Sequence, residues 1–236
     1  MKERRSESSP RVTARLAGLF SVLLPMAVAG QANIRSMFVM AGNPAATATN
    51  ILANQPLFQL GFTCSLIAVG IQLARALFIY ELFKPVSKSV SLYAVFVILV
   101  GCAIQALASL FYLAPLLVLR DVAPESVTPQ LQELAYLFIR LSKQTLNIYV
   151  VFLGFWFALI GCLIARSDFM PRIIGLPLFI CGVAWMLYLF PPLARQMSPL
   201  MMLIGSVLGE ASLALWLLVM GVNAQRWKDQ AGEQRA

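Results

Sequence analysis

Residues 90–119 read VSLYAVFVILVGCAIQALASLFYLAPLLVL, thirty consecutive positions without a charged side chain. About 20 apolar residues in a helix cross the hydrocarbon core of a bilayer, because each residue rises 1.5 Å through about 30 Å. Of the 236 residues, 60% are hydrophobic and 12% are charged, against about 45–50% and about 25% in soluble domains. This composition excludes a soluble domain, a disordered chain and a secreted disulfide scaffold, and it predicts a protein embedded in a membrane.

Five further stretches are long and apolar enough to cross a membrane. None alternates apolar and polar residues as a transmembrane β-strand does, so helices are expected. The predicted spans are 16–34, 57–83, 90–119, 145–165, 173–190 and 200–221. We expect an all-α polytopic membrane protein, a compact bundle of six transmembrane helices. Its expected parts are a basic cytoplasmic tail at 1–15, the six-helix domain at 16–222 and a cytoplasmic tail at 223–236.

Lysine and arginine are distributed unevenly between the predicted connections. Twelve lie in the two tails and in the connections at 84–88 and 166–172, and five lie in the connections on the other side. The side richer in these residues is ordinarily cytoplasmic, so we expect both termini there. The same bias explains the net charge of +8 without nucleic-acid binding. One alternative stays open, because Ala27-Val28-Ala29 after the apolar run resembles a signal-peptide cleavage site, and cleavage would leave five spans.

Two connections carry helix-start signals. Asn43-Pro44 predicts a short interfacial helix over 45–54, and Thr128-Pro129 is an N-cap and first-turn pair. Apolar residues then recur at helical spacing at Leu131, Leu134, Phe138 and Leu141. The second pattern predicts an amphipathic helix that lies on the membrane before the chain turns into the fourth span.

Ionisable residues inside the spans are the best candidates for a functional site, because a charge at the centre of a membrane helix costs about 2.5–3.5 kcal/mol. Arg75 lies in the second span and Glu210 in the middle of the sixth. Their depths differ by about 4–5 Å, which an arginine side chain can bridge. We expect the two to form an ion pair, with Gln72 beside Arg75 and Ser206 beside Glu210. Two alternatives are a pair that only organises packing and an Arg75 side chain that reaches the cytoplasmic surface.

The residues also exclude several kinds of site. The chain has no histidine and no nucleotide-binding motif, and its four cysteines each fall in a different span. We therefore expect no metal, no redox dithiol and no cofactor. Gly205 and Gly209 form a GxxxG pattern, which favours close helix packing within the chain or between the subunits of a homo- or hetero-oligomer.

Several stretches together resemble a known family. They are 11–20, 47–58 (TATNILANQPLF), 76–92, 151–178 and 209–223, and the most specific parts are RSDFMPRIIG at 166–175 and Gly209-Glu210 before the last apolar run. The chain is similar, over nearly its whole length after residue 11, to the bacterial "domain of unknown function 4386" membrane family. The resemblance implies a six-helix integral protein of the bacterial inner membrane with no assigned activity. It also implies an acidic residue in the second span, where this chain has none between Ser65 and Gln72.

Three functions fit these observations. The first is a protein that binds or carries a small hydrophobic molecule or lipid through Glu210, Arg75, Gln72 and Ser206. The second is a membrane scaffold or accessory subunit without a site of its own. The third, an enzyme acting on a lipid with Glu210 as acid or base, is disfavoured because no second carboxylate lies at a matching depth. We therefore assign no catalytic residue.

Overall fold

Helices account for the regular structure in the computed structural model, which describes residues 9–120, 127–190 and 207–233. The four longest helices are α1 (Pro10–Phe38), α3 (Gln55–Phe83), α4 (Lys88–Leu119) and α5 (Pro129–Arg166). The shorter ones are α2 (Pro44–Ala53), α6 (Arg172–Met186), η2 (Leu187–Leu189), η3 (Val207–Ala211), α9 (Ser212–Leu215), η4 (Trp216–Met220) and α10 (Ala224–Glu233). These described ranges contain no β-strand, which confirms the predicted all-α class.

Five helical segments are long and apolar enough to cross a membrane. They are α1, α3, α4, α5 and Arg172–Leu189, which comprises α6 and η2. A sixth is added if Leu208–Met220 and Ala224–Gly232, bent by 103° at their junction, count as one span. The protein is thus a polytopic membrane protein.

The fourth long helix differs in one respect from the expectation. The amphipathic segment that begins at Thr128-Pro129 continues into the span as one helix, α5, without the expected turn. The physical reason is that residues 130–153 contain neither glycine nor proline, so nothing interrupts the helix. The start signals themselves are confirmed, since Oγ1 of Thr128 accepts a bond from Leu131 N and Oδ1 of Asn43 accepts one from Ala46 N.

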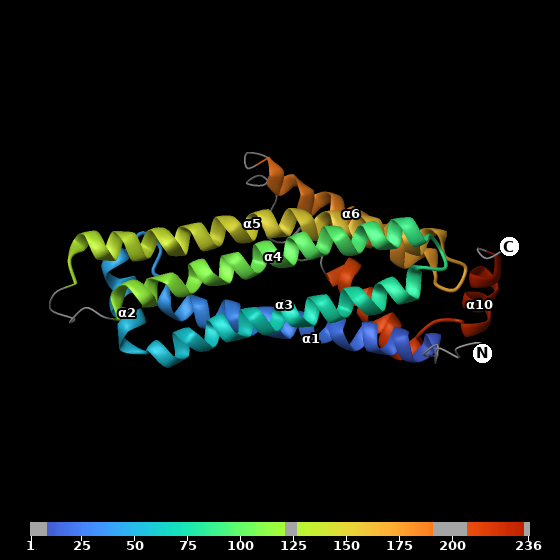
Figure 1. The fold of residues 1–236 in the computed structure, drawn as a ribbon, viewed down its shortest axis with the longest axis horizontal. Helices are drawn as coiled ribbons and strands as arrows, with labels where there is room; N and C mark the ends of the chain where they lie inside the picture. Colours follow the sequence, from blue (N-terminus) through green and yellow to red (C-terminus); the bar gives the residue numbers. More distant parts are fainter. Residues whose placement is uncertain (1–8, 121–126, 191–206, 234–236) are drawn as a thin grey trace, which may run out of the picture. The chain divides into compact units, whose positions relative to one another are not determined.

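The chain divides into two units, and α1, α3, α4 and α5 each contribute residues to both. Unit 1 comprises Met1–Leu23, Gln72–Val100 and Val150–Ala236, and unit 2 comprises Leu24–Ile71 and Gly101–Tyr149. In unit 1, the start of α1 and the C-terminal α10 lie at the same end (Figure 1). Nε1 of Trp227 in α10 donates to the carbonyl oxygen of Leu82 at 2.8 Å, which fastens α10 to the end of α3.

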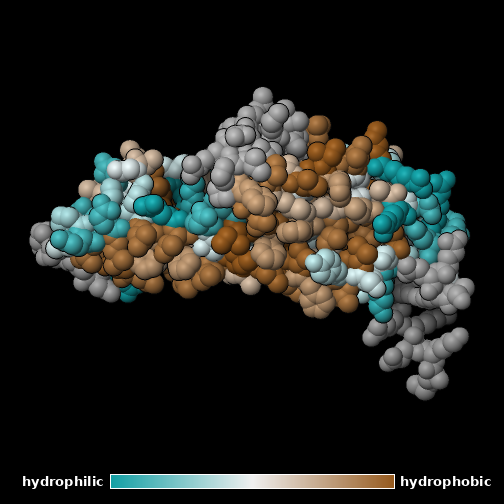
Figure 2. Space-filling view, turned by 90° about the horizontal axis from the view of Figure 1, so that it is seen from above, coloured by the Kyte–Doolittle hydropathy of each residue, from teal (hydrophilic) through white to brown (hydrophobic). Residues whose placement is uncertain are grey.

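Close packing of α5 on α6 forms one side of unit 1. A Cβ atom added at Gly182 would lie 2.5 Å from the backbone N of Ala158, and one at Gly161 would lie 2.7 Å from the carbonyl oxygen of Gly175. Small residues therefore let the two backbones meet, as is typical of helices in lipid. The other face of α6 exposes apolar side chains, including Leu176, Ile180 and Val183. In Figure 2, hydrophilic residues gather at the end of unit 1 that carries α10, next to a mostly apolar surface.

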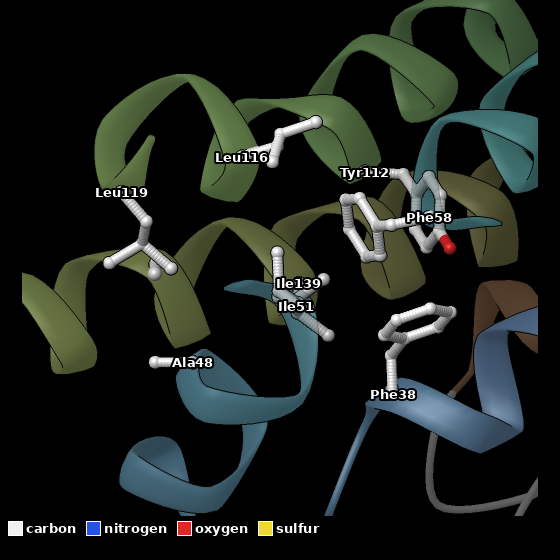
Figure 3. Packing of buried hydrophobic residues seen from close by; sticks show 9 residues of the cluster. Phe38, Ala48, Ile51, Phe58, Tyr112, Leu116, Leu119 and Ile139 are labelled. Atoms are coloured by element: carbon white, nitrogen blue, oxygen red, sulfur yellow. The ribbon is translucent and has the colours of Figure 1, made fainter. Parts of the chain in front are cut away.

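Unit 2 has its own apolar core, drawn in Figure 3. The rings of Phe58 and Tyr112 stack with centroids 4.4 Å apart, and Phe38 meets Phe58 edge-on at 5.3 Å. The aliphatic and small residues of the cluster are Ala48, Ile51, Leu116, Leu119, Ala135 and Ile139. The predicted short helix, α2, contributes Ala48 and Ile51 to this core, so its apolar face is buried against the other helices of the unit.

Candidate intramembrane polar site

Arg75, in the second half of α3, is completely buried, with 0% of its side chain exposed. Its Nη1 atom lies 2.6 Å from Oε1 of Glu210, so the two residues form an ion pair between α3 and η3. The Glu210 side chain is 16% exposed. The structure therefore brings together the two charges that the sequence placed at similar depth. Pairing offsets part of the cost of holding them away from water.

Two aromatic side chains of α5 lie against the Arg75 guanidinium group. Its Cζ atom is 4.7 Å from the ring centroid of Trp156 and 5.7 Å from that of Phe157. Both rings are buried, so the cation–π attraction acts without competition from water and is worth about 2 kcal/mol or more. Sequence reasoning missed this role of Trp156, because a tryptophan inside a span is ordinarily a packing residue.

Gln72 lies one helical turn before Arg75 and is also fully buried. Its Oε1 atom lies 3.5 Å from Nη1 of Arg75, at the long limit of a hydrogen bond. Within the described residues, three buried nitrogen atoms of these two side chains have no hydrogen-bond partner: Nε and Nη2 of Arg75 and Nε2 of Gln72. An unpaired buried donor costs about 1–3 kcal/mol, and more if it is charged. The two side chains thus offer donors that an acceptor group of a ligand can satisfy.

Glu210 is carried by a π-helical turn. Such turns are rare and are found frequently at functional sites, and here η3 and η4 lie on either side of the short α9. The adjacent Gly209 lies against α6, where a Cβ atom would be 3.1 Å from Cα of Leu178 and 3.3 Å from Cβ of Cys181. This contact holds η3 against α6 and so sets the place from which Glu210 reaches Arg75.

The structure therefore places three of the four predicted site residues together: Arg75, Gln72 and Glu210. Ser206, the fourth, lies outside the described residues. Chemically, the site combines an anionic acceptor on Glu210 with unpaired donors on Arg75 and Gln72. Glu81, the one acidic residue of α3, pairs at the surface with Lys84, where both side chains are 40% exposed. The buried site thus presents one carboxylate, which suits binding better than paired acid–base catalysis.

Comparison with known families shows which family the chain belongs to. The family model described as "Domain of unknown function (DUF4386)" matches residues 16–221. The chain belongs to the DUF4386 family. Comparison with curated proteins and with solved structures finds no match. Arg75, Gln72 and Glu210 all lie inside the matched range, so the polar site is part of the DUF4386 domain.

A second arginine of this DUF4386 protein, Arg35, differs from Arg75 in its hydrogen bonding. Arg35 of α1 lies in unit 2, where Nη2 donates to the carbonyl oxygen of Ile139 at 3.0 Å and Nη1 donates to Oγ of Ser142 at 3.4 Å. Its Cζ atom lies 5.6 Å from the ring centroid of Tyr112. Unlike Arg75, Arg35 has no buried nitrogen atom without a partner in the described chain. Arg35 therefore links α1 to α5 as a packing residue, and sequence reasoning counted it only as a charge in a connection.

One glycine of the predicted GxxxG pattern packs against another helix of the same chain. Gly209 packs on α6 of the same chain, as described above, and Gly205 lies outside the described residues. The four cysteines are free, and Cys102 and Cys181 are buried. Within the described parts of this DUF4386 protein, no group of three or more acidic, cysteine or histidine residues has the arrangement of a metal site.

Proposed function

We propose that this DUF4386 protein binds or carries a small hydrophobic molecule or a lipid within the membrane. Arg75, Gln72 and Glu210 would hold the polar group of that ligand, with Ser206 as a further member of the site. One observation carries the proposal: a completely buried arginine keeps two nitrogen atoms, and its neighbour Gln72 one, without partners in the described chain. Charged residues inside membrane spans ordinarily mark such sites.

The donors and acceptors indicate the chemistry of the ligand. Nε and Nη2 of Arg75 call for a carbonyl, carboxylate or phosphate oxygen, and Glu210 can accept a bond from a hydroxyl or amine group. The surrounding wall is apolar and aromatic, with Trp156 and Phe157 against the guanidinium. A ligand with an apolar body and one acceptor-bearing head group fits both features.

The proposed setting is the inner membrane of a bacterial cell, with both termini in the cytoplasm. Two observations support this orientation. Lysine and arginine are concentrated in the tails and in the connections on the same side. In unit 1, the start of α1 and α10 also lie at one end (Figure 1).

Mass spectrometry of molecules that stay bound after purification in mild detergent tests the proposal. We would compare the wild-type protein with Glu210→Gln and with Glu81→Gln, a matched control that makes the same change in the exposed pair with Lys84. We expect a defined lipid or metabolite in the wild type and in Glu81→Gln, reduced at least tenfold in Glu210→Gln.

Two results would contradict the proposal. Bulk lipid alone in all three samples would favour a scaffold or accessory subunit, and partner proteins should then be sought. A defined ligand retained equally by Glu210→Gln would move the site away from Arg75 and Glu210. Size-exclusion profiles of the three proteins exclude misfolding as the cause of a loss.

A further inference from the structure

A cavity lies in unit 1, and neither Arg75, Gln72 nor Glu210 lines it. It has a volume of about 400 Å³ and is lined by residues from the start of α1, from the α5–α6 connection and from the junction between η4 and α10. The lining residues are Arg11, Arg15, Phe169, Trp216, Met220, Gly221, Val222 and Asn223. The cavity therefore joins two guanidinium groups to an apolar and aromatic wall.

The electrostatic character of this cavity is positive. Arg11 and Arg15 are one helical turn apart and exposed, and within the described residues neither forms an ion pair. Among the residues that the structure describes, no acidic side chain lines the cavity, and the nearby Asp168 is 3.7 Å from Arg172. Arg11 lies in the first turn of the 29-residue helix α1, where the helix dipole disfavours a cation and favours an anion by about 0.3–1 kcal/mol. A bound anion would pair with both guanidinium groups and offset the unfavourable placement of Arg11 at the helix start.

The remaining lining fits a ligand that has an apolar part. Met220 is 66% exposed, and Trp216 and Val222 continue the apolar wall toward the η4–α10 junction. Oδ1 of Asn223 accepts bonds from the backbone N atoms of Gln225 and Arg226, which leaves its Nδ2 group to donate. The cavity lies where apolar helices meet charged segments, and lipid head groups occupy this depth.

We propose that this cavity binds the phosphate head group of an anionic phospholipid. Arg11 and Arg15 hold the phosphate oxygens, and Trp216 and Met220 contact the glycerol and the first carbons of the acyl chains. The site is independent of the proposed function, because it uses neither Arg75 nor Glu210. Free phosphate shares the head group's chemistry, but it would not use the apolar wall.

Native mass spectrometry of the full-length protein in mixed micelles tests this site. Phosphatidylglycerol and phosphatidylcholine are titrated separately against the wild type, Arg11→Gln/Arg15→Gln and the control Lys88→Gln/Arg166→Gln. The control removes the same charge from exposed residues of unit 1 that do not line the cavity. We expect one retained phosphatidylglycerol in the wild type and the control, and a roughly 30-fold weaker affinity in the cavity variant, because each arginine near the surface contributes about 1 kcal/mol.

Several outcomes would overturn the proposal. Equal weakening in both double variants would show a general charge effect, and equal binding of phosphatidylcholine would show no selectivity for an anion. Displacement of the lipid by millimolar inorganic phosphate would identify a free-anion site instead. If Arg11→Gln/Arg15→Gln does not fold, Met220→Glu places a carboxylate in the exposed wall and is expected to weaken binding as strongly.

Discussion

Arg75 is held by groups from three different elements. Gln72 comes from its own helix, Trp156 and Phe157 from α5, and Glu210 from η3. These contacts neutralise the charge and cover the guanidinium with aromatic rings, yet they leave Nε and Nη2 unpaired. The described contacts therefore compensate the buried charge of Arg75 and leave two of its donors unpaired.

A double-mutant cycle on the ion pair tests this account. Arg75→Met or Glu210→Met alone leaves the other charge without its partner, and we expect a loss of about 3–5 kcal/mol in the free energy of unfolding. Arg75→Met/Glu210→Met removes both charges and should lose less than either single variant. Unfolding in detergent, followed by circular dichroism, measures the effect. Losses that simply add would mean that the two charges do not interact in solution.

The sequence was sufficient to predict the ion pair but not its surroundings. Arg75 and Glu210 stand out because charges inside apolar spans are rare, and their depths follow from residue counts at 1.5 Å per residue. The contact with Trp156 depends on how α5 is rotated about its axis and on where it packs. Neither the rotation of α5 nor its packing position follows from hydropathy. The π-helical turn at Glu210 was missed for a similar reason, because no local pattern distinguishes it from an α-helical turn.

At the scale of elements, the glycine contact between α5 and α6 has a direct test. Gly182→Ala would place Cβ 2.5 Å from the backbone N of Ala158, so the helices must separate, and we expect a loss of about 1–3 kcal/mol in stability. Gly70→Ala on α3 is the control, because nothing lies within 4 Å of its new Cβ. Alanine there should stabilise the helix by about 0.5–1 kcal/mol. Thermal unfolding should show a lower melting temperature for Gly182→Ala and a higher one for Gly70→Ala. Equal shifts in melting temperature would argue against a close α5–α6 contact.

The ends of α3 and α4 could be predicted from the sequence, but the unbroken length of α5 could not. Long apolar runs locate α3 and α4 within two residues at either end, since lipid requires the backbone bonds to close within the helix. The length of α5 was underestimated, because its first part is less apolar and reads as a separate surface helix. Its inward face there consists of Ala135, Ile139 and Ser142, whereas Leu134 and Leu141 are exposed. Spacing identified a helix but not the face that it buries.

For the whole molecule, the testable property is orientation. We expect a fluorescent protein fused to either terminus to be active, because it folds in the cytoplasm, and alkaline phosphatase fused there to be inactive. Alkaline phosphatase inserted between residues 120 and 127 should be active, because that connection is expected on the outer side. An active phosphatase at the N-terminus with a fluorescent C-terminus would instead indicate an odd number of spans.

The ion pair between Arg75 and Glu210 also affects the insertion of the chain into the membrane during its synthesis. Arg75 and Glu210 are 135 residues apart in sequence, so ribosomes working at 5–20 residues per second deliver the partner roughly 7–27 s after the arginine. During that interval the newly inserted α3 holds a cation whose placement in lipid costs about 2.5–3.5 kcal/mol. Its long, otherwise apolar sequence must keep the helix in the membrane until the last span arrives. A nascent chain that stops before Glu210 would therefore expose an unpaired charge that quality-control proteases can recognise.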